Sequence, residues 1–121
     1  MRIYNDSLIT GTQTLNTNWT SAPQYLGHIA NFSIQGFWSG AIAGSFSLQA
    51  SSDIGQPSNA VNNALNVTNW TDVSNSSVTV SGAGDILYDV DNTGYTWVRL
   101  KWTYTSGSGQ LDSARMNGKG V

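Results

Sequence analysis

The sequence predicts an all-β protein, a single antiparallel β-sandwich of about seven to nine strands, with a pattern that a jelly roll would also give. Charged residues make up only 10% of the 121 residues, and every acidic residue is an aspartate. Helix-favouring residues are therefore scarce, whereas β-branched, aromatic and turn-forming residues are common. Short alternating segments separated by turn residues complete the evidence for this fold class.

The clearest strand covers residues 95–104, which hold two of the five tryptophans and two of the five tyrosines. With a period of two, one face of this strand carries Thr96, Val98, Leu100, Trp102 and Tyr104. We expect that face to pack in the core. The opposite face places Trp97 beside Arg99 and Lys101, and it can serve as a solvated surface, a ligand platform or a protein interface.

The other strands follow from alternation and from the glycine and proline breaks between them. In chain order they are expected over residues 2–9, 25–29, 31–38, 45–50, 77–81, 85–90 and 110–117. Residues 39–44 are expected to turn the chain between two strands of a hairpin. Residues 106–109 are expected to form a second tight turn.

The chain is long enough for one domain with a real core, and it contains no cysteine. Residues 21–121 are predicted to form the sandwich. Residues 1–20 are predicted to form an N-terminal strand or arm that reaches a neighbouring subunit. Residues 51–69, rich in asparagine and turn formers, are predicted to form a long loop, and loops of that length are often functional.

Composition also excludes several classes of function. A net charge of −2 and a pI near 4.8 leave no basic patch for nucleic acid. No apolar run reaches the roughly 20 residues of a membrane helix, and the N-terminus lacks the apolar region of a signal peptide. We therefore expect synthesis in the cytoplasm, with no nucleic acid and no membrane as partner.

The sequence also predicts that the protein is not an enzyme. The single histidine, His28, lies in no catalytic motif, and no nucleophile motif adjoins a strand-to-helix turn. We expect no catalytic residue and no cofactor.

Metal and sugar binding remain alternatives at the level of residue types. Asp85, Asp89 and Asp91 form a weak calcium candidate, because calcium prefers oxygen ligands, although an aspartate-rich turn has the same composition. No other metal site is expected. The interface or ligand candidates are Trp19, Trp70, Trp97, Arg99 and Lys101. Exposed tryptophans beside asparagine and aspartate are typical of sugar-binding sandwiches, whereas most large aromatic side chains pack in proteins.

Six motifs occur in one order along residues 30–120. They are Phe32-Ser33-Ile34-Gln35-x-x-Trp38, Gly44-Ser45-Phe46-Ser47-Leu48-Gln49-Ala50-Ser51-x-Asp53, Asn69-Trp70-Thr71-Asp72-Val73, Val80-Ser81-Gly82-Ala83-Gly84, Gly94-Tyr95-x-Trp97-Val98-Arg99 and Asn117-Gly118-Lys119-Gly120. Together they resemble a pattern found in small β-sandwich virion proteins of tailed bacteriophages, of the capsid decoration (cement) or head and tail-fibre type. Residues 51–69 depart from that pattern, because a short turn is expected there.

The resemblance implies a non-enzymatic structural protein of the virion. It implies a capsid decoration protein that binds the assembled head, with the major capsid protein or another virion protein as partner, and that forms a homo-oligomer. The alternative is a carbohydrate-binding or adhesin module of a virion or tail fibre, with a glycan as ligand.

Overall fold

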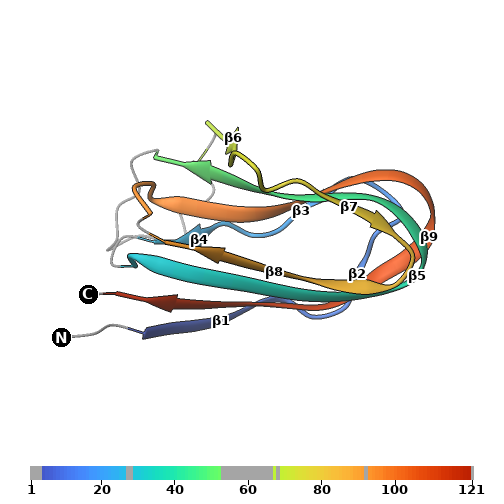
Figure 1. The fold of residues 1–121 in the computed structure, drawn as a ribbon, viewed down its shortest axis with the longest axis horizontal. Helices are drawn as coiled ribbons and strands as arrows, with labels where there is room; N and C mark the ends of the chain where they lie inside the picture. Colours follow the sequence, from blue (N-terminus) through green and yellow to red (C-terminus); the bar gives the residue numbers. More distant parts are fainter. Residues whose placement is uncertain (1–3, 27–28, 53–66, 68, 92, 121) are drawn as a thin grey trace.

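The computed structural model describes residues 4–26, 29–52, 67, 69–91 and 93–120, with the backbone alone described for residues 4–7. The strands are β1 (Tyr4–Thr10), β2 (Gln13–Thr14), β3 (Trp19–Thr20), β4 (Gln24–Tyr25), β5 (Asn31–Ser51), β6 (Thr71–Asp72), β7 (Val78–Ser81), β8 (Gly84–Val90) and β9 (Trp97–Lys119). They form one antiparallel sheet, and the described residues contain no helix, hence none that could cross a membrane (Figure 1). The prediction of an all-β antiparallel protein is confirmed.

Two long strands organise this sheet. β5 has 21 residues and β9 has 23, and they pair along their whole lengths, from Asn31 opposite Lys119 to Ser51 opposite Trp97. Both strands curve back on themselves, so that the two ends of each lie on the same side of the molecule (Figure 1). Each long strand therefore contributes to two halves of the sheet.

The two halves carry different neighbours. In the first, the β8 half, residues 32–38 of β5 pair with β8, and residues 114–119 of β9 pair with β1. In the second, the β7 half, residues 43–50 of β5 pair with β7 and β6, and the start of β9 pairs with β3 and β4. The short β2 pairs with Gln110 and Leu111, near the bend.

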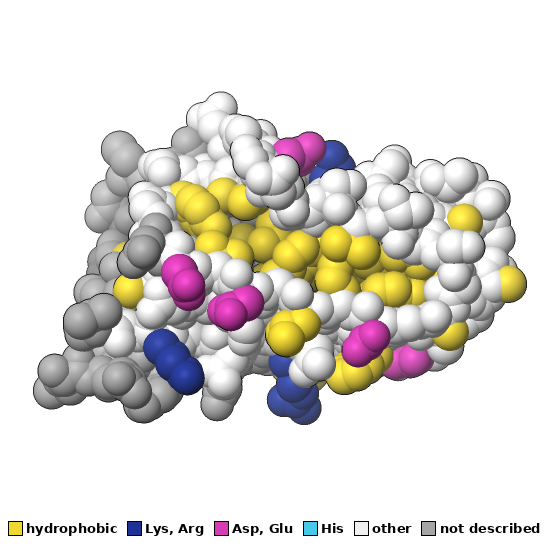
Figure 2. Space-filling model, in the orientation of Figure 1, with side chains coloured by type: hydrophobic (Ala, Val, Ile, Leu, Met, Phe, Trp, Pro, Cys, Tyr) yellow, Lys and Arg dark blue, Asp and Glu magenta, His cyan; other side chains and the backbone are white. Residues whose placement is uncertain are grey.

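The core lies between the halves. The Trp38 ring of the β8 half lies 5.1 Å from the Phe46 ring of the β7 half, and Phe46 lies 4.7 Å from Trp102, measured between ring centroids. Val98, Leu100 and Trp102 are fully buried, which confirms the inward face predicted for them. Figure 2 shows apolar side chains as a band along the edge where the halves meet, between β8 and the segment of β6 and β7.

The two predicted turns at residues 39–44 and 106–109 are wrong as hairpin turns, because the strand segments before and after each stretch do not pair with each other. Both stretches continue their strands, and they lie opposite each other, with Gly40 paired with Gly109 and Ala41 with Ser108. Gly40 has a φ of 102° and Gly107 a φ of 86°, a backbone conformation that glycine adopts without the steric cost of a Cβ atom. The glycines therefore bend the paired strands together, and the sheet folds over at this corner.

The N-terminal segment is part of the same sheet. β1, β2 and β3 all pair with β9 of their own chain, and the Leu15 side chain is fully buried in the core. The Trp102 Nε1 donates a hydrogen bond to the Leu15 carbonyl oxygen over 2.8 Å. Residues 4–20 are therefore built into the sandwich. Their contact with a neighbouring subunit stays a prediction.

Candidate functional site

Alternation along β5 and β9 places a row of polar side chains on the outer face of the β7 half. Gln49 lies opposite Arg99 on one side and opposite Asp72 of β6 on the other. The Arg99 Nε donates to the Gln49 Oε1 over 2.8 Å, and the Gln49 Nε2 donates to the Asp72 Oδ1 over 2.9 Å. Lys101 Nζ lies 3.7 Å from the same Asp72 oxygen. These four residues, together with Trp70, form what we call the polar network.

Trp70 joins the network through its ring. The Arg99 guanidinium carbon lies 4.2 Å from the ring centroid, within the range of a cation–π contact. The indole Nε1 donates to the Val67 carbonyl oxygen over 3.1 Å. Partial burial lowers the pKa of Arg99, because water is removed from around its charge. The structure thus brings Trp70, Arg99 and Lys101 together, although the sequence separates Trp70 from the other two.

Trp97 does not offer an exposed ring, contrary to the platform that alternation placed beside Arg99 and Lys101. Its side chain is only 2% exposed, and its ring packs against Tyr25 of β4 at 5.1 Å between centroids. The two-residue strand β4 places Tyr25 opposite Trp97, and this cover was not visible from the period of β9 alone. Trp19, the fifth candidate, is half-buried opposite Trp102 and packs against the core, away from the network.

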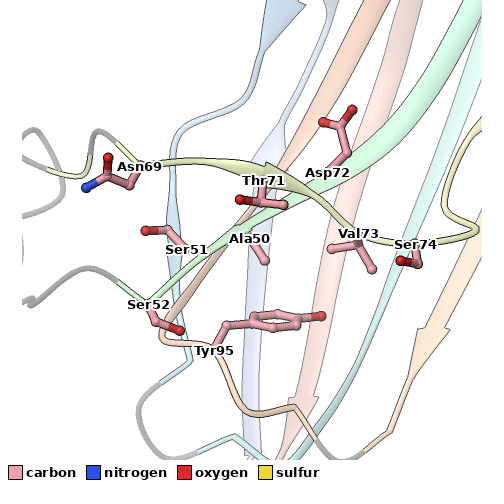
Figure 3. A pocket seen from close by; sticks show the side chains of 9 residues that line it. All are labelled: Ala50, Ser51, Ser52, Asn69, Thr71, Asp72, Val73, Ser74 and Tyr95. Carbon is pink, nitrogen blue, oxygen red and sulfur yellow. The ribbon is translucent and has the colours of Figure 1, made fainter.

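A cleft of about 580 Å³ opens beside the network (Figure 3). The end of β5 and the segment through β6 pair with each other and form one continuous wall, and the Tyr95 ring lies beside it. The lining residues are Ala50, Ser51, Ser52, Asn69, Thr71, Asp72, Val73, Ser74 and Tyr95. Asp72 supplies the only charge among these residues, and its carboxylate points away from the Tyr95 ring, toward the network (Figure 3). The described lining of the cleft is therefore uncharged apart from Asp72 and rich in hydroxyl groups.

Buried hydrogen bonds hold the β6 wall in place. The Val73 amide donates to the Leu48 carbonyl oxygen over 2.8 Å, just beyond the pairing of β6 with β5. Ser76, which is buried, accepts a bond from the Leu48 amide at its Oγ over 3.0 Å. The Tyr88 hydroxyl of the β8 half donates to the Ser76 carbonyl oxygen over 2.7 Å. The wall is thus tied to both halves of the sandwich.

Tyr95 contributes an unusual group to the cleft. Its ring packs edge-on against Phe32, with centroids 6.4 Å apart, while its hydroxyl is buried and finds no hydrogen-bond partner among the residues that the structure describes. Burial raises the pKa of this hydroxyl.

Sequence reasoning did not identify the cleft. The sequence signals that could have indicated it were Ser51 and Ser52 at the start of the predicted loop, Asn69 at its end and Thr71 just beyond it. Residues 53–66 of that loop, as well as His28, lie outside the described part of the chain.

The calcium candidate is not assembled. Asp85 and Asp89 lie four residues apart along β8, opposite Phe37 and Ser33, which separates them by roughly 13 Å at the rise of a strand. Asp89 and Asp91 line a small hollow together with Lys119. The positive charge of Lys119 repels a metal cation at that place. No group of three acidic or histidine side chains that could hold a metal occurs among the residues the structure describes.

The outer face of the β8 half is apolar in part. Leu8, Phe37 and Leu87 are exposed by 54, 45 and 63% of their surfaces. The register places Leu8 opposite Arg115, Arg115 opposite Gln35, and Gln35 opposite Leu87, so these residues form one row across four strands. Phe37 follows Gln35 by two residues and shares its face. We call Leu8, Phe37 and Leu87 the apolar face.

No protein-family model matches the sequence, and no curated protein sequence matches it. Solved structures do share the fold. The SPBc2 prophage-derived protein YomS superposes with a TM-score of 0.56 at 10% identity, over 98% of this chain and 95% of YomS. The PBSX exported protein XepA gives 0.53 at 13% identity, over 97% of this chain but 37% of XepA. A chain of the disulfide-linked pili that form Bacillus endospore appendages gives 0.54 at 9% identity, over 99% and 88%. At these identities the likeness is one of fold.

Proposed function

We propose that this chain is a non-enzymatic structural protein of a bacteriophage particle, a capsid decoration (cement) protein that binds the assembled head and stabilises it. The observation that carries the proposal is the apolar face. Exposed large apolar side chains on one face of a small domain are candidates for protein–protein contact, and here Arg115 and Gln35 lie between Leu8 and Leu87 in the same row. The fold shared with two prophage-derived proteins supports a phage setting.

The apolar face fits attachment to a shell better than it fits a solitary domain. Leu8, Phe37 and Leu87 would be removed from water against a capsid subunit, and Arg115, in the same row, would select an acidic neighbour. Each contact would be weak for so small a patch. Many copies on one lattice, or a homo-oligomer of this chain, would raise the overall affinity through multivalency.

The second candidate function is a carbohydrate-binding or adhesin module of a virion or tail fibre. The observation that favours it is the hydroxyl-lined cleft beside the polar network. Capsid attachment would use the β8 half of the sandwich and sugar binding the β7 half, so variants on each half can distinguish the two functions.

Co-sedimentation with expanded phage capsids tests the decoration role. Leu87→Asp places a charge on the apolar face at a side chain that is 63% exposed, so the fold should be kept. We expect the bound fraction to fall at least about tenfold, because the charge would have to be buried against the shell. Thr79→Asp, at an exposed position of β7 on the other half, is the matched control and should bind as the parent does. Equal binding of parent and Leu87→Asp would contradict attachment through this face.

A further inference from the structure

We propose that the cleft beside β6 is a binding site for a neutral saccharide. This inference is independent of attachment through the apolar face, which lies on the other half of the sheet. A volume of about 580 Å³ falls within the roughly 300–1,000 Å³ that small-molecule sites in proteins occupy. The cleft is therefore large enough for a ligand of that class.

The hydrogen-bonding groups of the cleft match the hydroxyl groups of a sugar. Ser52, Thr71 and Ser74 line it, and within the described part of the chain none of their hydroxyls is engaged in a hydrogen bond. A hydroxyl both donates and accepts, so it pairs with another hydroxyl in either sense.

The apolar groups of the cleft match the other side of a sugar ring. Ala50, Val73 and the Tyr95 ring line the interior, and Figure 3 shows the Val73 side chain directed toward the same space as the Tyr95 ring. An aromatic ring offers a broad apolar surface at low conformational cost, and the C–H faces of a saccharide are apolar. Small ligand sites commonly combine such a surface with a few directed polar groups.

The charges argue against an anionic ligand. No lysine or arginine lines the described cleft, and both nearby cations are held in the network, Arg99 by Gln49 and Trp70, and Lys101 by Asp72. Phosphate and carboxylate groups are ordinarily bound by cationic side chains or by backbone amides at a helix N-terminus. A nucleotide or a phosphorylated sugar therefore fits less well than a neutral one.

The strand geometry argues against an extended peptide. A peptide that adds to the edge of a sheet gains affinity from a row of main-chain hydrogen bonds. β6 lies at the edge of the sheet but has only two residues, Thr71 and Asp72, so it offers too short a row of main-chain groups for such an addition. By contrast, a saccharide needs side-chain hydroxyls, and those of Thr71 and Ser74 stand on a wall fixed by the Val73–Leu48 bond. Such prior ordering lowers the entropic cost of binding.

The site can be tested by NMR titration of the ¹⁵N-labelled full chain. The probes are neutral trisaccharides of glucose, galactose and N-acetylglucosamine, each used separately, with glucose 6-phosphate as the anionic comparison. We expect at least one trisaccharide to shift the amide signals of Thr71 to Ser74 and of Tyr95 in a saturable manner. Glucose 6-phosphate should not shift them.

Matched variants assign the binding to the cleft. The double variant Thr71→Val, Ser74→Ala removes two hydroxyls with little change of shape and should weaken binding about fivefold or more, since each hydrogen bond contributes modestly. Thr79→Val, Ser81→Ala makes the same change at exposed positions of β7 and should leave binding unchanged. Melting curves of both variants show that each is folded.

Three outcomes would overturn the proposal. They are the absence of any saturable shift with all three trisaccharides, shifts that map to residues outside the cleft, and equal affinity for the parent and the Thr71→Val, Ser74→Ala variant. Leu87→Asp should bind the saccharide as the parent does. Failure of capsid binding and failure of saccharide binding can thus be told apart.

Discussion

At the scale of single residues, two tyrosines with buried hydroxyl groups show how differently one side chain can be accommodated. The Tyr88 hydroxyl donates to the Ser76 carbonyl oxygen over 2.7 Å, whereas the Tyr95 hydroxyl has no partner within the described part of the chain. Burial raises the pKa of both, because the phenolate would be poorly hydrated. Of the two hydroxyls, only that of Tyr88 replaces its lost hydrogen bond to water with a hydrogen bond to a described residue of the protein.

Replacement by phenylalanine should therefore affect the free energy of unfolding differently at the two positions. Tyr88→Phe should lower the free energy of unfolding by about 1–2 kcal/mol, because it leaves the buried Ser76 carbonyl oxygen without its donor. Tyr95→Phe should leave that free energy unchanged or raise it by up to about 1 kcal/mol, since it deletes an unsatisfied polar atom. Urea unfolding followed by tryptophan fluorescence measures both. A larger loss for Tyr95→Phe than for Tyr88→Phe would show that the Tyr95 hydroxyl is satisfied in solution.

Trp97 marks the limit of what could be predicted for a single residue. A period of two identifies the face of a strand, and it placed Val98, Leu100 and Trp102 in the core as the structure has them. It could not show that Tyr25, 72 positions earlier, covers the Trp97 ring. Exposure on an outer face depends on contacts between distant segments, and these leave no local pattern.

At the scale of elements, the two long strands depend on glycines at their common bend. Gly107 has a positive φ, and a Cβ atom there would collide with the carbonyl oxygen of Ala41 on the paired strand. Gly40, on the paired strand β5, likewise has a positive φ and leaves no room for a Cβ atom. In a sequence alone, a glycine that bends a continuous strand looks the same as a glycine that reverses the chain. This is why the strand segments on either side of each bend were predicted correctly, while the two bends between them were predicted as hairpin turns.

Gly107→Ala should destabilise the fold by at least about 2 kcal/mol, because the left-handed backbone and the clash both oppose a Cβ atom. Gly94→Ala is the matched control. A Cβ atom there meets nothing within 4 Å, so its effect should stay within about 0.5 kcal/mol. Thermal unfolding by circular dichroism compares the two. If Gly107→Ala melts at the temperature of Gly94→Ala, the bend does not require glycine at that position.

At the scale of the whole molecule, segments from both ends of the chain build one core. β1, β2 and β3 lie along β9, and Leu15 fills a site between them and the long strands with no exposed surface. The sequence predicted an N-terminal strand, but polar residues on either side of Leu15 concealed its place in the core. The sandwich class followed from composition and alternation. The candidate site did not, because its lining comes from segments on either side of residues 53–66.

Deletion of residues 1–20 should therefore abolish cooperative unfolding rather than merely detach a subunit contact. The deletion removes Leu15 and the carbonyl oxygen that accepts from Trp102 Nε1, and so leaves a cavity and a buried unpaired donor.

The point variant Leu15→Ala should by itself cost about 2–5 kcal/mol, whereas Leu8→Ala, at a residue that is 54% exposed, should cost less than about 1 kcal/mol. Calorimetry of the three chains measures these effects. A truncated chain that melts cooperatively at the parent's temperature would show that residues 1–20 are dispensable to the fold. A subunit contact of this segment is accordingly better tested by Thr12→Arg, a substitution at an exposed position, with the oligomeric state measured by analytical ultracentrifugation.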